Sequence, residues 1–227
     1  MKRLVVLSGA GISAESGIPT FRGADGLWEG HDVTAVASPE GWERDPELVL
    51  EFYNQRRKAI RKARPHRGHH VLAELQDEFA IDIITQNIDD LHERAGSRNV
   101  LHLHGQINQS RSSIDPSLVY PIEGDELNPG DCCELGSQLR PNVVWFGEMV
   151  PAMEKAVELT MRADIFIVVG TSLLVYPAAS LLEFVPYDVP KFIVDPNVPD
   201  IKSPGIQVIE EPAGTGLAKV REILRDL

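Results

Sequence analysis

Residues 4–22, LVVLSGAGISAESGIPTFR, decide the fold, because a short apolar run leads directly into a glycine-rich turn. Gly9, Gly11 and Ala14 match the dinucleotide-binding spacing G-x-G-x-x-G/A, in which missing side chains let the backbone approach a pyrophosphate. Taken alone, that spacing is also typical of ordinary strand-to-helix turns. Residues 17–22 add a fixed turn, an aromatic ring and a guanidinium suited to a diphosphate. The combination favours a nucleotide site.

Composition narrows the class of protein. With 227 residues, 43% of them hydrophobic, the chain can bury a large core as one domain or as a domain with an insertion. The 22 basic and 34 acidic residues give a net charge of −12, which argues against nucleic acid as a partner. No segment approaches the roughly 20 apolar residues that a membrane-spanning helix needs, so no membrane association is expected. The first apolar run ends at Ser8, too early for a signal peptide. We therefore expect a soluble, cytoplasmic protein.

Helix and strand patterns alternate along the chain and predict a doubly wound, Rossmann-like α/β fold with a smaller inserted module. Strands are expected at residues 4–8, 81–85, 100–104, 143–146, 164–170, 192–195 and 206–209, and helices at 45–62, 68–78, 153–161, 178–184 and 217–224. The large part is predicted to comprise residues 1–23, 65–104 and 141–227. The small module would comprise residues 24–64, mainly helical, and 105–140, which shows little apolar periodicity.

Four of the expected strands end in polar residues or glycine, at residues 9–11, 85–89, 104–105 and 170–172. In open parallel sheets, ligands bind outside the carboxyl ends of the strands. We therefore expect these four segments to form the functional site.

Five blocks carry a family resemblance: GAGISAESGIPTFR at 9–22, TQNIDDLHERAG at 85–96, HLHG at 102–105, RPNVVWFGE at 140–148 and GTSLLVYPA at 170–178. In this order and spacing the chain resembles a sirtuin, and in particular the compact bacterial sirtuins of the class that prefers acidic acyl groups. The resemblance implies an NAD-dependent protein-lysine deacylase acting on acetyl and acidic acyl groups. It would consume NAD as a co-substrate and release nicotinamide and 2′-O-acyl-ADP-ribose.

The resemblance also assigns residues to NAD. They are Gly9, Ala10, Gly11 and Ser13 at the pyrophosphate, through backbone amides; Phe21 and Arg22 over the ribose and phosphates; Gln86, Asn87 and Asp89 around the nicotinamide; Gly170, Thr171 and Ser172 on the adenosine side; and Asp195, Gly214 and Thr215 near the ribose and adenine. Each is also typical of a cap or turn after a strand. Many family members have Asn in place of Asp195, but a carboxylate also accepts from ribose hydroxyls.

His104 is the expected general base, which in the family removes a proton from a ribose hydroxyl. An unperturbed imidazole suits that task near neutral pH. His102 is the rival, because alternate residues of a strand share a face. His104 lies at the carboxyl end of its expected strand and matches the family position, so we assign His102 to packing or support. The remaining histidines are expected to have surface or structural roles: His31, His66, His69, His70 and His92.

Substrate residues follow from the same resemblance. The peptide backbone would pair by strand addition with the segment that holds Val144, Phe146, Gly147 and Glu148, clamped opposite Val175.

Tyr53 and Arg56 are the expected determinants of the acyl group. Three residues apart on a helix, they share a face and could converge on one carboxylate. Helix spacing alone favours a core tyrosine beside a solvated arginine, whereas resemblance to the acidic-acyl signature Tyr-x-x-Arg favours binding. Ala37 falls where such members leave room for a longer acyl chain.

The chain departs from most sirtuins at the structural zinc site. The first Cys-x-x-Cys pair falls near residues 110–113, which contain no cysteine, and the second is reduced to Cys132 and Cys133. Adjacent cysteines do not readily supply a four-ligand cage, so no zinc is expected.

Three alternative functions remain open: a dinucleotide-binding oxidoreductase, a non-catalytic NAD-binding module and a protein ADP-ribosyltransferase. The HLHG and VVWFGE blocks, and the lack of an acidic residue ending the second strand, argue against the first. The sequence leaves the oligomeric state and the substrate proteins undetermined.

Overall fold

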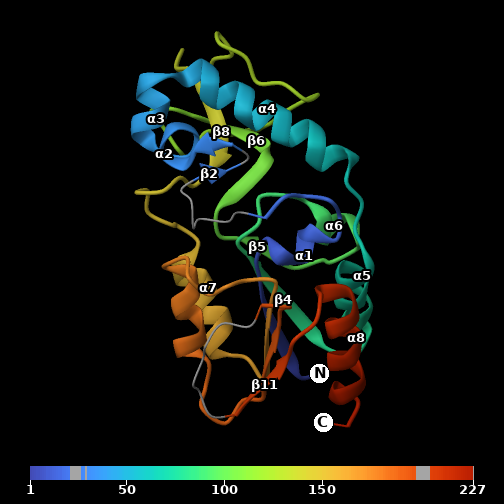
Figure 1. Ribbon diagram of the computed structural model, residues 1–227. Helices are drawn as coiled ribbons and strands as arrows, with labels where there is room; N and C mark the ends of the chain where they lie inside the picture. The colour runs from blue at the N-terminus through green and yellow to red at the C-terminus, as the bar shows by residue number, and fades with distance from the viewer. Residues whose placement is uncertain (21–26, 29, 198–204, 227) are drawn as a thin grey trace. The chain divides into compact units, whose positions relative to one another are not determined.

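The computed structural model describes residues 1–20, 27–28, 30–197 and 205–226. The chain divides into two compact units. Unit 1 comprises Met1–Thr20, Arg64–Leu103 and Val150–Leu227, and unit 2 consists of the described residues within Phe21–Ala63 and His104–Met149. Figure 1 shows the elements of both.

Unit 1 contains a parallel six-stranded sheet. Its strands are β1 (Arg3–Ser8), β4 (Ala80–Thr85), β5 (Val100–His102), β9 (Ile165–Val169), β10 (Lys191–Val194) and β11 (Ile206–Ile209). Their order is β11-β10-β9-β1-β4-β5, the strand order of dinucleotide-binding doubly wound folds. The predicted fold class is therefore confirmed. The strand order reverses between β1 and β9.

The sheet is apolar on both faces because its strands alternate between two cores. In β1, Leu4 and Val6 lie in one core and Val5 and Leu7 in the other. The helices α5 (Arg67–Glu74) and α8 (Ala213–Leu224) cover the first face, and α7 (Met153–Met161) with the 3₁₀ helix η3 (Ala178–Phe184) covers the second (Figure 1). This double burial explains the near-continuous apolar strands.

Several expected elements differ in extent from those observed. The helix expected at 68–78 is α5 followed by the 3₁₀ turn η2 (Leu75–Asp77), and the last helix begins at Ala213 rather than at 217. The strand expected at 100–104 ends at His102. The chain also forms two short helices, α1 (Gly11–Ala14) and α6 (Leu91–Arg94).

Unit 2 begins with a two-stranded pair, β2 (Leu27–Trp28) and β3 (His31–Asp32), and continues with three helices. These are α2 (Val33–Val36), α3 (Pro39–Arg44) and α4 (Pro46–Lys62). Asp45 caps α4 by accepting from the Leu48 amide at 3.0 Å, and Pro46 occupies the first turn.

A three-stranded antiparallel sheet completes unit 2, in the order β7 (Val119–Pro121), β6 (Gly105–Ser112) and β8 (Leu139–Val143). Two predictions are corrected here. The strand expected at 143–146 overlaps the observed strand β8 only at Val143, and residues 141–149, expected in the large part, belong to unit 2. Strand β6 is mostly polar and escapes a hydropathy pattern, and an apolar run does not reveal which strand it pairs with.

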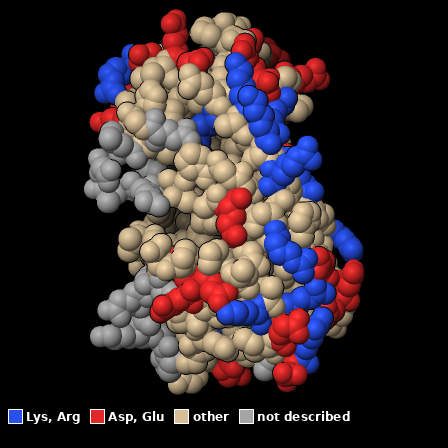
Figure 2. Space-filling model, turned by 45° about the vertical axis from the view of Figure 1, so that its right-hand side comes forward, with Lys and Arg blue, Asp and Glu red and all other residues tan. Residues whose placement is uncertain are grey.

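Residues 56–67 contain a run of basic side chains, and these side chains do not all face solvent. Arg56 and Arg57 are buried, whereas Lys58 pairs with Glu126 and Arg61 with Asp125 at 2.7 and 3.1 Å. Figure 2 shows Lys and Arg side chains gathered over this part of the surface.

Arg57 ties α4 to the rest of unit 2. Its Nε donates to the Ile107 carbonyl at 2.7 Å, and its Nη1 donates to Asn54 Oδ1 and to the Asp125 carbonyl at 2.7 and 2.9 Å. Burial, together with the charge of Arg61, lowers the pKa of Arg57 to about 10. The side chain nevertheless remains a cation at neutral pH.

We predict that Arg57→Ala lowers the free energy of unfolding by about 2–4 kcal/mol, because it leaves buried carbonyl oxygens without a donor. Urea denaturation at neutral pH measures the change. Arg61→Ala, which removes an exposed ion pair from the same helix, should cost about 0–1 kcal/mol. Equal costs for the two variants would contradict the anchoring role of Arg57.

In the part of the chain that the structure describes, no helix is long and apolar enough to cross a membrane.

Candidate functional site

Two backbone loops meet where the strand order of unit 1 reverses. The amide of Gly9 donates to the Val169 carbonyl at 3.0 Å, and the amide of Gly11 donates to the Gly170 carbonyl at 2.7 Å. A Cβ on Gly9 would lie 2.7 Å from the Gly170 oxygen, and one on Gly170 would collide with the Ile12 amide. Gly170 also has a φ of +64°. Glycine is therefore required at this junction.

These contacts reduce the number of backbone amides that are available to bind a pyrophosphate. The amides of Gly9, Gly11 and Ser13 all donate to carbonyl groups of unit 1, so they are already engaged. Among the described residues, no acceptor takes the amide of Ala10. The glycines thus let the two loops pack closely and leave no side chain over the turn. The backbone amide of Ala10 remains available to donate to an anion.

Asn87, Asp89 and Ser13 form a buried polar cluster after β4 and β1. Asn87 Nδ2 donates to the Gly9 carbonyl at 3.1 Å and to Ser13 Oγ at 3.2 Å, and Ser13 Oγ donates to Asp89 at 2.9 Å. No described residue donates to Asn87 Oδ1. Burial raises the pKa of Asp89, although hydrogen bonds from the Leu91 amide and from Ser13 oppose the shift.

Ser8 and Thr85 hold the backbone of Asn87 in this cluster through hydrogen bonds. The sequence did not predict this role. Ser8 Oγ donates to Thr85 Oγ1 at 2.9 Å, and Thr85 Oγ1 accepts from the Asn87 amide at 3.1 Å. His92 Nε2 lies 2.9 Å from Ser8 Oγ, whose proton is already used, so this nitrogen must be the donor. Burial lowers the pKa of His92 to about 4, so the ring is neutral at pH 7, and the hydrogen bond to Ser8 selects the tautomer protonated on Nε2.

His102 supports Asn87 from the neighbouring strand, as its assignment to packing or support anticipated. Its Nδ1 lies 2.9 Å from the Asn87 carbonyl and its Nε2 lies 2.7 Å from Glu93 Oε1. Both partners are acceptors, so both ring nitrogens donate and the ring is an imidazolium. Burial lowers the pKa of His102, but the hydrogen bond and charge of Glu93 outweigh it and raise the pKa above its ordinary value.

The other residues expected to contact NAD in unit 1 lie at the carboxyl ends of strands or near α8. Gln86 Nε2 donates to Thr171 Oγ1 at 3.1 Å, and Ser172 is exposed beside it in sequence. Asp195 directly follows β10 and is half-buried, which raises its pKa. Gly214 and Thr215 fall in the first turn of α8.

The N-terminus of α8 is already occupied by a carboxylate, because Glu15 Oε2 accepts from the Gly214 amide at 2.8 Å. Phe21 and Arg22, expected over the ribose and phosphates, lie outside the described residues.

In unit 2, His104 is half-buried and immediately precedes β6. Gly105 has a φ of +80°, and a Cβ there would collide with the Asn142 carbonyl. The glycine lets β6 pair closely with β8 and so fixes where the His104 side chain begins. The His104 carbonyl accepts from the Val144 amide at 2.9 Å.

The amides of residues 144–146 are used within unit 2. Those of Val144, Trp145 and Phe146 donate to the His104 carbonyl, to Glu148 Oε2 and to the Ala37 carbonyl at 2.9, 2.7 and 3.0 Å. Among the described residues, no acceptor takes the amide of Gly147. Strand addition here would therefore rely on carbonyl groups and Gly147.

Glu148, expected to bind substrate, has its carboxylate engaged by its own unit. It accepts from Arg140 Nη1 at 2.7 Å, from Arg111 Nη2 at 3.0 Å and from the Trp145 amide. Burial raises its pKa, but Arg140 and the other donors outweigh burial and the net pKa is lowered. Glu148 thus holds the 144–148 segment in place.

Tyr53 and Arg56 are both buried in unit 2, with exposed fractions of 0% and 6%. The Arg56 guanidinium lies 4.4 Å from the centre of the Trp28 ring. Helix spacing alone favoured a solvated side chain for Arg56, and that interpretation is wrong. Ala37 is buried at the end of α2, and its carbonyl accepts from the Phe146 amide.

Val175, the remaining expected substrate residue, lies in unit 1 and is half-buried. Its neighbours Leu174 and Tyr176 are 78% and 69% exposed.

Near Cys132 and Cys133, where no zinc site is expected, two serine hydroxyl groups surround one thiol. Cys133 Sγ lies 3.5 Å from Ser112 Oγ and 3.1 Å from Ser137 Oγ, and these two oxygens are 2.8 Å apart. Cys132 is exposed, and both cysteines are free. Among the described residues, no group of three or more His, Cys, Asp or Glu side chains is placed to hold a metal ion.

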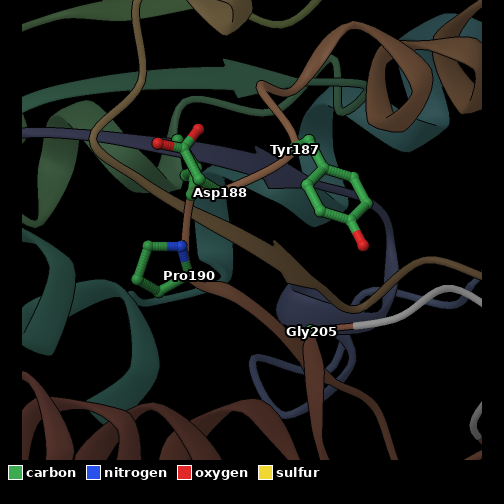
Figure 3. A pocket seen from close by; sticks show the side chains of 5 residues that line it. Tyr187, Asp188, Pro190 and Gly205 are labelled. Atoms are coloured by element: carbon green, nitrogen blue, oxygen red, sulfur yellow. The ribbon is translucent and has the colours of Figure 1, made fainter.

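A shallow hollow of about 360 Å³ lies elsewhere in unit 1 and is lined by Tyr187, Asp188, Val189, Pro190 and Gly205 (Figure 3). Pro190 and Gly205 precede β10 and β11, so the hollow is at the amino ends of the strands. It is therefore separate from the carboxyl-end site of this unit.

Comparison with known proteins identifies the family. The model of the Sir2 family matches residues 9–177. An NAD-dependent protein deacylase of Helicobacter pylori is 54% identical over 214 residues, which cover 94% of this chain and 93% of that protein. The chain belongs to the Sir2 family.

Solved structures agree with this assignment. A Sir2 homologue in complex with NAD has a TM-score of 0.87 and 40% identity, covering 99% of this chain and 90% of that one. A Sir2 homologue in complex with 2′-O-acetyl ADP ribose has a TM-score of 0.86 and 39% identity, covering 99% and 92%.

We predict that the His102–Glu93 pair contributes most stability between about pH 4.5 and 6.5. The raised pKa of His102 makes its contribution complete below about pH 6.5 and lost as the pH rises through the folded value. The lowered pKa of Glu93 makes its contribution present above about pH 4.5 and lost on acidification. Urea unfolding should show Glu93→Gln costing on the order of 1 kcal/mol at pH 6 and less at pH 9.

Glu222→Gln is the control, because its exposed partner Arg225 does not titrate in this range. A cost for Glu93→Gln that is equal at both pH values would contradict the charged pair.

Proposed function

We propose that this chain removes acetyl, succinyl and malonyl groups from lysine side chains of proteins, releasing nicotinamide and 2′-O-acyl-ADP-ribose. As a Sir2 family member it is an NAD-dependent protein deacylase and uses NAD. The complex of a similar protein with 2′-O-acetyl ADP ribose supports the product. Two residues of α4, Tyr53 and Arg56, support the proposed activity on acidic acyl groups.

The carboxyl ends of β1, β4, β9 and β10 fit NAD. The glycine junction leaves no side chains over the turn, and the Ala10 amide and the Asp195 carboxylate offer a donor for phosphate and an acceptor for ribose hydroxyls. When bound, NAD supplies the ribose carbon that receives the acyl oxygen as nicotinamide leaves.

In this proposal, residues of the protein orient the nicotinamide and remove a proton from a ribose hydroxyl. Asn87 is held by Gly9, Ser13 and Thr85 with its Oδ1 available to the amide of nicotinamide. Asp89 is held by Ser13 beside it. His104 acts as general base toward a ribose hydroxyl.

We predict that His104→Ala lowers deacylation by about 10²–10⁴-fold, because it removes the base, while NAD affinity stays within a few-fold. Nicotinamide release and calorimetric NAD binding measure the two effects. His31→Ala, at a histidine given no role in the reaction, is the control. Near wild-type turnover in His104→Ala would reject the assignment.

The observation that carries the acyl preference is a buried phenol and a buried guanidinium on one face of α4. Tyr53 Oη accepts a hydrogen bond from Trp145 Nε1, which leaves its own proton to donate. Arg56 is three residues further along the helix and stacks on Trp28. A terminal carboxylate placed between them could accept a hydrogen bond from each.

We predict that Arg56→Met lowers kcat/KM for succinyl- and malonyl-lysine peptides about 10–100-fold, the loss of one charged hydrogen bond. Deacetylation of the same peptide should fall far less, because an acetyl group carries no carboxylate. Arg61→Met removes the same charge from an exposed site on the same helix and should leave the ratio of the activities unchanged. Equal losses on all three acyl groups would make Arg56 structural and the protein a general deacetylase.

A further inference from the structure

The indole of Trp145 contacts the phenol of Tyr53 inside unit 2. Trp145 Nε1 donates to Tyr53 Oη at 3.1 Å, and the two side chains are 2% and 0% exposed. The sequence assigns substrate contacts to the neighbours Val144 and Phe146 but no individual role to Trp145. A buried indole N–H requires an acceptor, and here that acceptor is the phenol.

Trp145 cannot easily turn away from Tyr53. The Arg140 guanidinium lies 3.2 Å from the centre of its ring, and Arg140 is itself held by Glu148 at 2.7 Å. Glu148 also accepts from the Trp145 backbone amide at 2.7 Å. Side chain and backbone of Trp145 are therefore fixed by the same carboxylate, and so is the direction of the indole N–H.

This contact restricts the Tyr53 hydroxyl. Conjugation with the ring keeps a phenol O–H near the ring plane, where two opposite orientations are available. The approaching indole N–H disfavours the orientation that faces it, so the proton points the other way. Among the described residues, no side chain or carbonyl accepts that proton. Burial raises the pKa of Tyr53, and the smaller opposing effect of Trp145 does not reverse this, so the phenol remains a donor.

We infer that Trp145 is a positioning residue for acyl specificity: its indole N–H directs the Tyr53 hydroxyl proton toward the carboxylate of an acidic acyl group. The inference rests on the proposed function, because Tyr53 must face that carboxylate. It adds a residue outside the acyl pocket that sets how well the pocket discriminates.

Trp145→Phe tests the inference, because phenylalanine can still stack on Arg140 but cannot donate. The ratio of kcat/KM for succinyl-lysine to that for acetyl-lysine in one peptide should fall about 3–10-fold, the loss expected for one neutral hydrogen bond. Trp42→Phe is the matched control: its ring lies 5.9 Å from that of Trp145, and it does not donate to Tyr53. In this control the ratio should not change.

A double-mutant cycle with Tyr53→Phe separates positioning from packing. If Trp145 acts through the hydroxyl, Trp145→Phe should have no further effect on the ratio once Tyr53→Phe is present. The indole N–H resonance of Trp145 should also shift in Tyr53→Phe. Independent losses in the two backgrounds, an unshifted resonance, or an unchanged ratio in Trp145→Phe would each overturn the inference.

Comparison with Arg56→Met distinguishes the two possible failures. If Arg56→Met acts selectively on acidic acyl groups but Trp145→Phe does not, only the positioning role is rejected. If Arg56→Met lowers all acyl activities equally, the acyl preference itself fails and the role of Trp145 is rejected with it.

Discussion

The close approach of two backbone loops, one after β1 and one after β9, is the constraint on which the site in unit 1 depends. The amides of Gly9 and Gly11 bond directly to carbonyls of Val169 and Gly170, and a side chain at the junction would separate them. Because the strand order reverses between these strands, the two connections lead to opposite faces of the sheet. The carboxyl ends between them are left open to a ligand.

This constraint changes the meaning of the glycine motif. The motif suggests amides that cradle a phosphate, but most of those amides here join the two loops. In the proposed function, NAD binding then depends on the side chains that the junction of the two loops holds around it. Asn87 is the clearest example, since its side chain reaches Gly9 and Ser13, and its backbone is held by Thr85 and His102. A side chain held at both ends loses little freedom on binding, so its free oxygen is preorganised.

Unit 2 uses charge in a comparable way. Glu148 pairs with both Arg111 and Arg140 and accepts from the backbone amide of Trp145, so these three charged groups hold an aromatic ring in place. Removing one partner of such a buried network costs more than the network contributes as a whole. The network contributes more to geometry than to stability, because it holds the indole N–H, the phenol and the α4 backbone in one arrangement.

The fold class and the family could be predicted from the amino-acid sequence, because each depends on local features: apolar strands, glycine spacing and polar strand ends. The functional site at the carboxyl ends of the strands stays a prediction. The sequence also predicted α4, whose cap at Asp45 and Pro46 is encoded in adjacent residues. The sequence did not predict that β8 pairs with β6 in the small sheet, since pairing partners lie far apart in sequence. The tertiary structure alone decided the roles of Ser8, Glu148 and Trp145, because a side chain's hydrogen-bond partner depends on which distant residues folding brings within 3 Å or so.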